Sequence, residues 1–115
     1  MESEARLSQE AVCRRAGVDV CECPEDLKIG VARNIRDGTL PINGLRMSAS
    51  GDTAGWYIWS GDWSDDPEFF VPLHVRHLAA WCPQAVPYIL LPTGWRFQVA
   101  PNHEDVWFDP ELSTK

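Results

Sequence analysis

The centre of the chain reads Gly55-Trp56-Tyr57-Ile58-Trp59-Ser60-Gly61-Asp62-Trp63-Ser64-Asp65-Asp66-Pro67. Aromatic and β-branched residues favour strands, so the first half of this segment predicts a strand. Because side chains alternate along a strand, Trp56 and Ile58 should share one face, and Tyr57 and Trp59 the other. Both faces are apolar, so we expect a central strand that is covered on both sides.

The second half of the segment predicts an acidic loop that carries one large aromatic side chain. A tryptophan among carboxylates is either an anchor for a partner or a lid folded back on the core. We expect Trp59 and Trp63 to be the exposed tryptophans, and tryptophan is enriched among the residues that dominate interface energies. The candidate partner-binding residues are Trp59, Asp62, Trp63, Asp65, Asp66 and Glu68.

The 115 residues are enough for one domain with its own core. Apolar runs stay well short of the roughly 20 residues that a membrane-spanning helix needs. The N-terminus is acidic and polar, unlike a secretory signal. We therefore expect a cytoplasmic protein with no membrane partner.

The formal net charge is −7, from 17 acidic and 10 basic side chains. This balance argues against nucleic acid as the partner, because phosphate contacts need a clustered positive surface. It fits an ordinary soluble surface, and it equally fits a surface that is complementary to a basic protein.

Before the central strand, the sequence predicts one helix and two strands. Ser8 is a suitable N-cap and Gly17 a suitable C-cap for a short helix, which would follow frayed residues 1–7. Alternating apolar and small residues predict a strand over about 29–35. A weaker strand at 42–47 follows.

After the central strand, the pattern changes to helices and then returns to strands. Residues 67–72 are extended and apolar, 73–81 have helical periodicity, and 84–91 predict a second short helix. Strict alternation predicts a final hairpin of 95–100 with 105–109.

This order of elements predicts an α+β domain, with a mainly antiparallel sheet of about five strands and two or three short helices on one face. We divide the chain into an N-terminal helix and connector at 1–26 and a single domain at 27–112.

Catalytic and metal-binding patterns are weak. The spacing of Cys21 and Cys23 is tighter than in the usual zinc site, and His74 and His77 lack the spacing and the glutamate of a zinc protease helix. No glycine-rich phosphate loop is present. We therefore predict no catalytic residue, no cofactor and no metal. The alternative is a small metal-binding protein or enzyme that uses Cys21, Cys23, His74, His77 or Cys82.

A further alternative is a structural adaptor or homodimer built through an exposed edge strand such as 42–47. For the oligomeric state we expect a monomer or a weak homodimer.

Several segments together resemble one known family. They are Ile29 to Asn34, Leu40 to Gly44, Gly55 to Asp62, Asp65-Asp66-Pro67, Trp81-Cys82-Pro83, Val86-Pro87-Tyr88, Gly94-Trp95-Arg96-Phe97 and Trp107-Phe108-Asp109-Pro110. The chain is similar over about residues 27–112 to the thirty-third of the numbered immunity families of bacterial polymorphic toxin systems, formerly a domain of unknown function.

The resemblance implies a non-enzymatic, intracellular immunity protein that binds and neutralises a cognate protein toxin by direct contact. A basic toxin would complement the acidic surface. The family offers no catalytic residues to carry over. The chain departs from the family pattern in its N-terminal helix and in the region of Cys13, Cys21 and Cys23.

Overall fold

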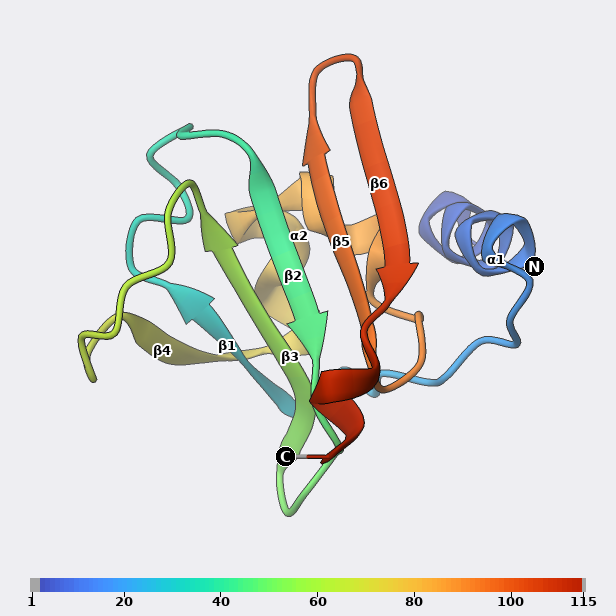
Figure 1. Ribbon diagram of the computed structural model, residues 1–115, viewed down its shortest axis with the longest axis horizontal. Helices are drawn as coiled ribbons and strands as arrows, with labels where there is room; N and C mark the ends of the chain where they lie inside the picture. The colour runs from blue at the N-terminus through green and yellow to red at the C-terminus, as the bar shows by residue number, and fades with distance from the viewer. Residues whose placement is uncertain (1–2, 115) are drawn as a thin grey trace.

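The computed structural model describes residues 3–114, and Figure 1 shows the sheet with its helices. The elements are α1 (Glu4–Ala16), β1 (Lys28–Ala32), β2 (Ile42–Arg46), β3 (Thr53–Ser60), β4 (Phe70–His74), η1 (Val75–His77), α2 (Leu78–Trp81), η2 (Pro83–Tyr88), β5 (Trp95–Ala100), β6 (His103–Phe108) and η3 (Pro110–Thr114). The strands form one six-stranded sheet in the order β4-β1-β3-β2-β5-β6.

The sheet is mixed. β1 and β3 run parallel, and the other neighbouring strands are antiparallel. The α+β class is thus confirmed, but the mainly antiparallel sheet of about five strands needs two corrections. The added strand is β4, whose residues 70–74 pair along β1. The parallel pair arises because β2 turns back along the other side of β3.

The central strand β3 has the predicted alternation. Trp56 and Ile58 are completely buried on the face towards the helices, and Trp56 donates its Nε1–H to the Ile89 carbonyl oxygen at 2.8 Å. Tyr57 lies on the opposite face and is 36% exposed, so that face is covered only in part. Gly55 has φ of 97°, and a Cβ atom there would lie 2.1 Å from the Met47 carbonyl oxygen, so the position requires glycine.

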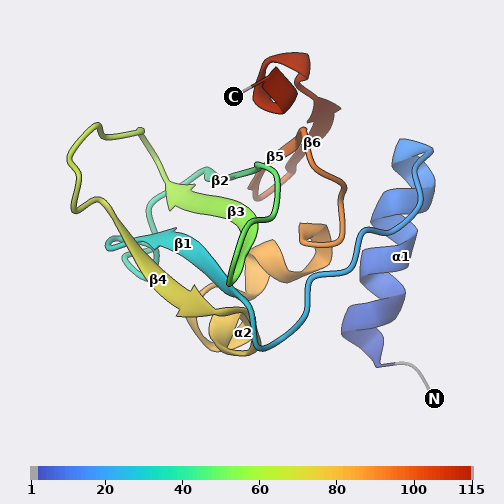
Figure 2. The same cartoon turned by 90° about the horizontal axis from the view of Figure 1, so that it is seen from below.

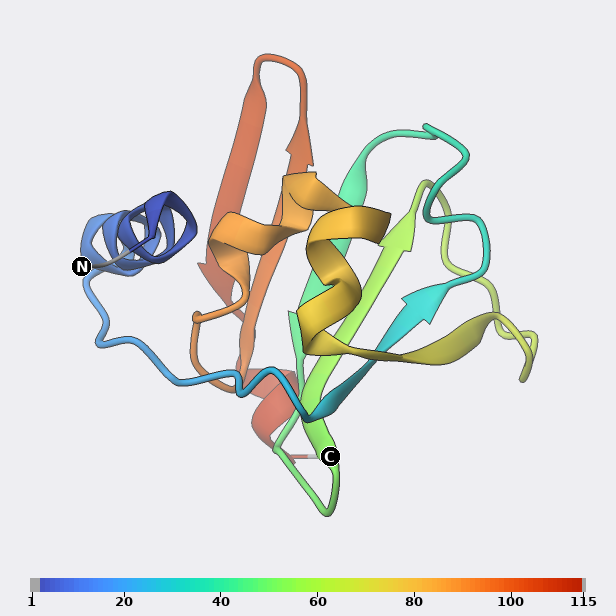
Figure 3. The same cartoon turned by 180° about the vertical axis from the view of Figure 1, so that it is seen from behind.

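The two faces of the sheet are covered differently. Figure 3, seen from behind, shows α2 and η2 in front of the sheet, and Figure 2 shows η3 and α2 on opposite sides of it. We call the side towards α2 and η2 the back face and the other side the front face. The back face carries the larger hydrophobic core, whereas a smaller cluster that includes Leu45, Trp59 and Leu112 lies on the front face.

The helices differ from their predicted bounds. Gly17 is the C-cap as expected, but the N-cap is Ser3 and not Ser8, so residues 3–7 are ordered rather than frayed. The predicted helix 73–81 is helical only from residue 75, because its first residues belong to β4. The predicted helix 84–91 is the 3₁₀ segment η2, in which Pro83 and Pro87 lack the N–H groups that an α-helix would use.

The predicted edge strand 42–47 is wrong, because β2 lies inside the sheet between β3 and β5. The sheet edges are β4 and β6, and both are protected. Residues 69 and 75 bond to the β1 side, so the intervening Pro72 faces outward, where it offers no N–H to another strand. Helix α1 lies beside β6 (Figure 1), and an Arg15 Nη2–Glu104 Oε1 ion pair of 3.2 Å joins them.

A buried arginine connects the N-terminal connector to the sheet. Arg46 is 2% exposed, and its guanidinium donates to five main-chain carbonyl oxygens. These acceptors belong to Cys21, Glu22, Ala54, Ile89 and Leu91. One side chain therefore fixes three segments that are distant in sequence. No helix within residues 3–114 has the length and apolar character to cross a membrane.

Candidate functional site: the Trp63 loop and the front face

The front face changes from aromatic to polar across the sheet. Tyr57 pairs with Gly30 on one side and Leu45 on the other, and an aromatic edge contact joins Tyr57 to Phe70 at 5.3 Å between centroids. Towards β6 the same face carries Arg96, which forms a 3.1 Å ion pair with Asp109. The aromatic half lies on β1, β3 and β4, where the sheet meets the acidic loop.

We call residues 61–69 the Trp63 loop. The Trp63 ring folds back onto the front face, with centroid distances of 4.9 Å to Trp59 and 5.2 Å to Phe70. Trp63 is nevertheless 50% exposed, whereas Trp59 is 5% exposed. The expected exposure is thus correct for Trp63 and wrong for Trp59, which is covered by the loop and supports it.

The loop is held by its own hydrogen bonds. Trp63 Nε1–H donates to Asp65 Oδ1 at 3.0 Å, and the Glu68 N–H donates to Asp66 Oδ1 at 2.9 Å. From outside the loop, Arg33 donates its Nε–H to the Glu68 carbonyl oxygen at 2.6 Å. A surface held in this way loses less conformational entropy when a partner binds.

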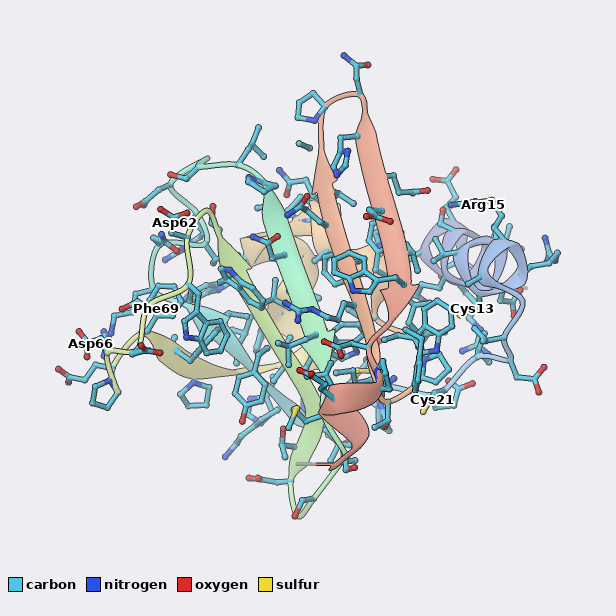
Figure 4. All side chains as sticks on the ribbon, viewed as in Figure 1. Cys13, Arg15, Cys21, Asp62, Asp66 and Phe69 are labelled. Atoms are coloured by element: carbon cyan, nitrogen blue, oxygen red, sulfur yellow. The ribbon has the colours of Figure 1, made fainter. Side chains whose placement is uncertain are left out.

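The four carboxylates of the predicted site lie on the same loop as the exposed indole, and Asp65 bonds to it. Asp62, Asp65, Asp66 and Glu68 are all exposed, and Figure 4 shows Asp62 and Asp66 on the same side of the molecule as Phe69. The structure therefore brings the predicted residues into one surface, with an aromatic centre and an acidic rim. Aromatic anchors with a polar rim are typical of protein–protein contacts.

Of the five residues of the metal-binding alternative, Cys23 and Cys82 lie in the core, Cys21 and His74 are partly buried, and His77 is exposed. Cys23 and Cys82 are buried, and burial raises the pKa of both thiols, that of Cys23 to about 11. His74 and His77 are neighbours, with ring centroids 6.2 Å apart. Over residues 3–114, no three His, Cys, Asp or Glu side chains are grouped as metal ligands. Protonated, buried thiols are poor nucleophiles and poor metal ligands.

Sequence reasoning missed some members of this surface. Tyr57 belongs to this surface. The alternation of side chains along the strand places Tyr57 on the same face as Trp59, and this pattern could have identified it. Phe69 and Phe70 complete the aromatic support, with centroids 4.9 Å apart. Their prediction required knowing that β4 joins the sheet beside β1.

Comparison with known families gives one match. Residues 8–109 match the sequence model of the Imm33-like domain. This span begins inside α1, earlier than the 27–112 on which the resemblance rested. The comparisons with curated proteins and with solved structures gave no match.

Proposed function

The chain belongs to the Imm33-like domain family, and from this premise we propose that it is a cytoplasmic immunity protein that neutralises a cognate protein toxin by binding it. The proposal is one of inhibition by contact, without catalysis by this chain. The observation that carries it is the half-exposed Trp63 at the centre of an acidic surface.

Three properties of the Trp63 loop support a role in binding. The indole presents apolar area that is costly to leave in water. Its position is fixed from below by Trp59 and Phe70. The carboxylates around it would attract a basic partner and orient it during approach.

We propose that Trp63 is the anchor and that Asp62, Asp65, Asp66 and Glu68 contact basic side chains of the toxin. Trp59 contributes by holding Trp63 in place. This arrangement places the strongest contact at the centre and the screened charges at the rim, as in other protein interfaces.

The test needs a cognate toxin, which is sought among the products of the neighbouring genes. The toxin is expressed in bacteria with the wild-type chain or with Trp63→Ala, and survival and co-purification are measured. Loss of an interface tryptophan costs about 2 kcal/mol or more, so we expect roughly 30-fold weaker binding and loss of protection.

An Asp65→Asn, Asp66→Asn double variant should associate more slowly with the toxin, because it removes rim charge. For the same reason, its affinity should fall less steeply with added salt than the affinity of the wild type. Glu4→Gln is the control, since it removes one exposed carboxylate from the first turn of α1. Unchanged protection by the Trp63→Ala variant would contradict the assignment of this surface. Absence of any complex with the toxin would contradict the proposed function itself.

A further inference from the structure

A groove lies at the end of the sheet where β3 and β5 finish. It lies between the β5–β6 hairpin tip, η2 and the segment before β2, and its volume is about 860 Å³. We call it the hairpin groove. Its lining includes Leu40, Ile42, Tyr88, Val99, His103 and Glu104. Grooves of this size accept side chains or small ligands.

One wall of the hairpin groove carries a carboxylate that a buried tyrosine positions. The buried Tyr88 ring stacks on Phe97, with centroids 4.9 Å apart, and its hydroxyl donates a hydrogen bond to Glu104 Oε2. Burial first, and this bond second, raise the pKa of Tyr88, so the phenol stays protonated and keeps donating. The geometry of Glu104 is therefore set before any partner arrives.

The charge of Glu104 is only lightly compensated. Among the described residues 3–114 its ion-pair partner is Arg15, with Arg15 Nη2 3.2 Å from Glu104 Oε1, and both side chains are largely open to solvent. Exposed pairs of this kind are weak and exchange readily. A second cation entering from the groove can therefore share or replace the contact with Arg15.

The walls of the groove are partly apolar. Leu40 is 45% exposed, and Val99 and Ile42 line the groove close to the sheet, whereas Gln84, Asn102 and His103 add polar groups. A positioned carboxylate beside apolar wall residues matches an arginine or lysine side chain, whose methylene stem is apolar and whose head is charged. The planar guanidinium of arginine can also bond a carboxylate through two N–H groups.

We propose that the hairpin groove receives an arginine side chain of the toxin, with its head on Glu104 and its stem along Leu40 and Val99. This proposal rests on the proposed function and names a second contact of the same partner. The formal net charge of −7 favours a basic partner.

A hydrogen-bonded segment links the base of the Trp63 loop to the groove, although the Trp63 ring lies on the front face and η2 lies on the back face. The Gly61 N–H donates to the Pro41 carbonyl oxygen at 2.9 Å, and the Ser60 hydroxyl bonds to the Thr39 carbonyl oxygen. The segment that carries Leu40 thus runs from the base of the loop to the groove. Figure 1 shows the end of β3, the start of β2 and the end of β5 at the same end of the sheet. A single partner would have to cover this end of the sheet to contact both sites.

The test titrates the full chain with N-acetyl-arginine methylamide and follows the backbone amide resonances by NMR. N-acetyl-norleucine methylamide is the uncharged comparison. We expect the arginine probe to shift the amides of Tyr88, Val99 and Glu104, and the norleucine probe to shift them much less. Glu104→Gln should weaken the binding of the arginine probe about fivefold, the scale of a partly exposed ion pair.

Two further variants provide a charge control and a test of the apolar wall. Asp26→Asn removes one exposed carboxylate just before β1, at the opposite end of the sheet, and should leave the titration unchanged. Leu40→Ser removes an apolar wall and should weaken binding of both probes. Equal affinity of the wild-type and Glu104→Gln chains, or shifts confined to the Trp63 loop, would overturn the proposal.

The titration needs no toxin, so the two proposals fail separately. A negative titration removes the hairpin groove as an arginine site and leaves the immunity function standing. A toxin that does not bind the chain removes the immunity function, while a positive titration would still establish the groove as an arginine site.

Discussion

The indole of Trp63 meets the indole of Trp59 edge-on, with ring centroids 4.9 Å apart and an angle of 88° between the planes. One ring is half exposed, and the other is buried beneath it. The two tryptophans of the predicted binding site therefore have different roles. Trp59 determines where Trp63 lies, and Trp63 provides the exposed surface.

Alanine substitution should separate these roles. Trp59→Ala opens a cavity in the front-face cluster and should lower the free energy of unfolding by about 3–5 kcal/mol. Trp63→Ala loses ring contacts and one exposed hydrogen bond to Asp65 at the surface, and should cost about 0.5–1.5 kcal/mol. Urea unfolding of both variants measures the difference. If the two variants lost the same stability, the distinction between support and contact would be wrong.

Replacement of Arg46 should be among the most destabilising changes. Arg46→Met removes the shared donor of five carbonyl oxygens, of which only that of Ile89 keeps a side-chain donor, Trp56 Nε1–H, and should cost about 3–5 kcal/mol. Arg46→Lys should be nearly as costly, because an ammonium cannot reach the same set of acceptors.

The connector should respond locally to the same change. Arg46 binds the carbonyl oxygens of Cys21 and Glu22, so hydrogen exchange over residues 18–26 should accelerate in the Arg46→Met variant. Arg14→Met is the control, since Arg14 is an exposed arginine in the last turn of α1 and its loss should change stability by less than about 0.5 kcal/mol. Unchanged exchange in the connector would show that Arg46 does not hold it.

Gly44 and Phe97 should behave as a coupled pair. A Cβ atom on Gly44 would lie 2.1 Å from Phe97 Cε2, so Gly44→Ala should force the ring to move and cost about 1–3 kcal/mol. Phe97→Leu in the same chain should recover part of that loss. A double-mutant cycle by chemical unfolding measures the coupling. Strict additivity of the two substitutions would contradict the contact.

Stability should fall in mild alkali because of Cys23. Burial raises the pKa of this thiol from 9.0 to about 11, so the unfolded chain loses the proton at lower pH than the folded one. The stabilisation is therefore complete below pH 9 and is lost as the pH rises towards 11. Between pH 8 and pH 10.5 the wild type should lose about 2 kcal/mol through this group alone.

The measurement is urea unfolding at pH 8 and pH 10.5 for the wild type and for Cys23→Ala. The variant should lose less stability over this interval, although other buried groups such as Tyr88 still contribute. An identical pH dependence in the two proteins would exclude Cys23 as a source of it.

Local sequence patterns predicted the elements that short-range chemistry determines. The β5–β6 hairpin, the alternation in β3 and the Gly17 cap are all present. Pairing between distant strands was not predictable in the same way. β1 pairs with β3 in parallel, and β2 lies inside the sheet because Gly44 leaves room for the Phe97 ring. Such choices depend on packing across the whole sheet.

The residue types of the candidate site could be predicted from the sequence, but their arrangement in space could not. The acidic residues around Trp63 are visible in the sequence, and the structure groups them on one loop. The covering of Trp59, and the hairpin groove beside Glu104, arise from chain segments that meet only in the folded state. Arg46 lies in a strand where its burial and its five acceptors could not be read from neighbouring residues.

The position of β2 inside the sheet has a consequence for synthesis on the ribosome. Its partner β3 follows closely in the chain, but its other partner, β5, begins only at Trp95. Before β5 is available, the chain therefore presents an open strand edge at β2, and the Phe97 ring does not yet pack over Gly44. Open edges of this kind invite pairing with other chains. Strand β5 thus closes the edge of β2 that stays open after β3 has paired.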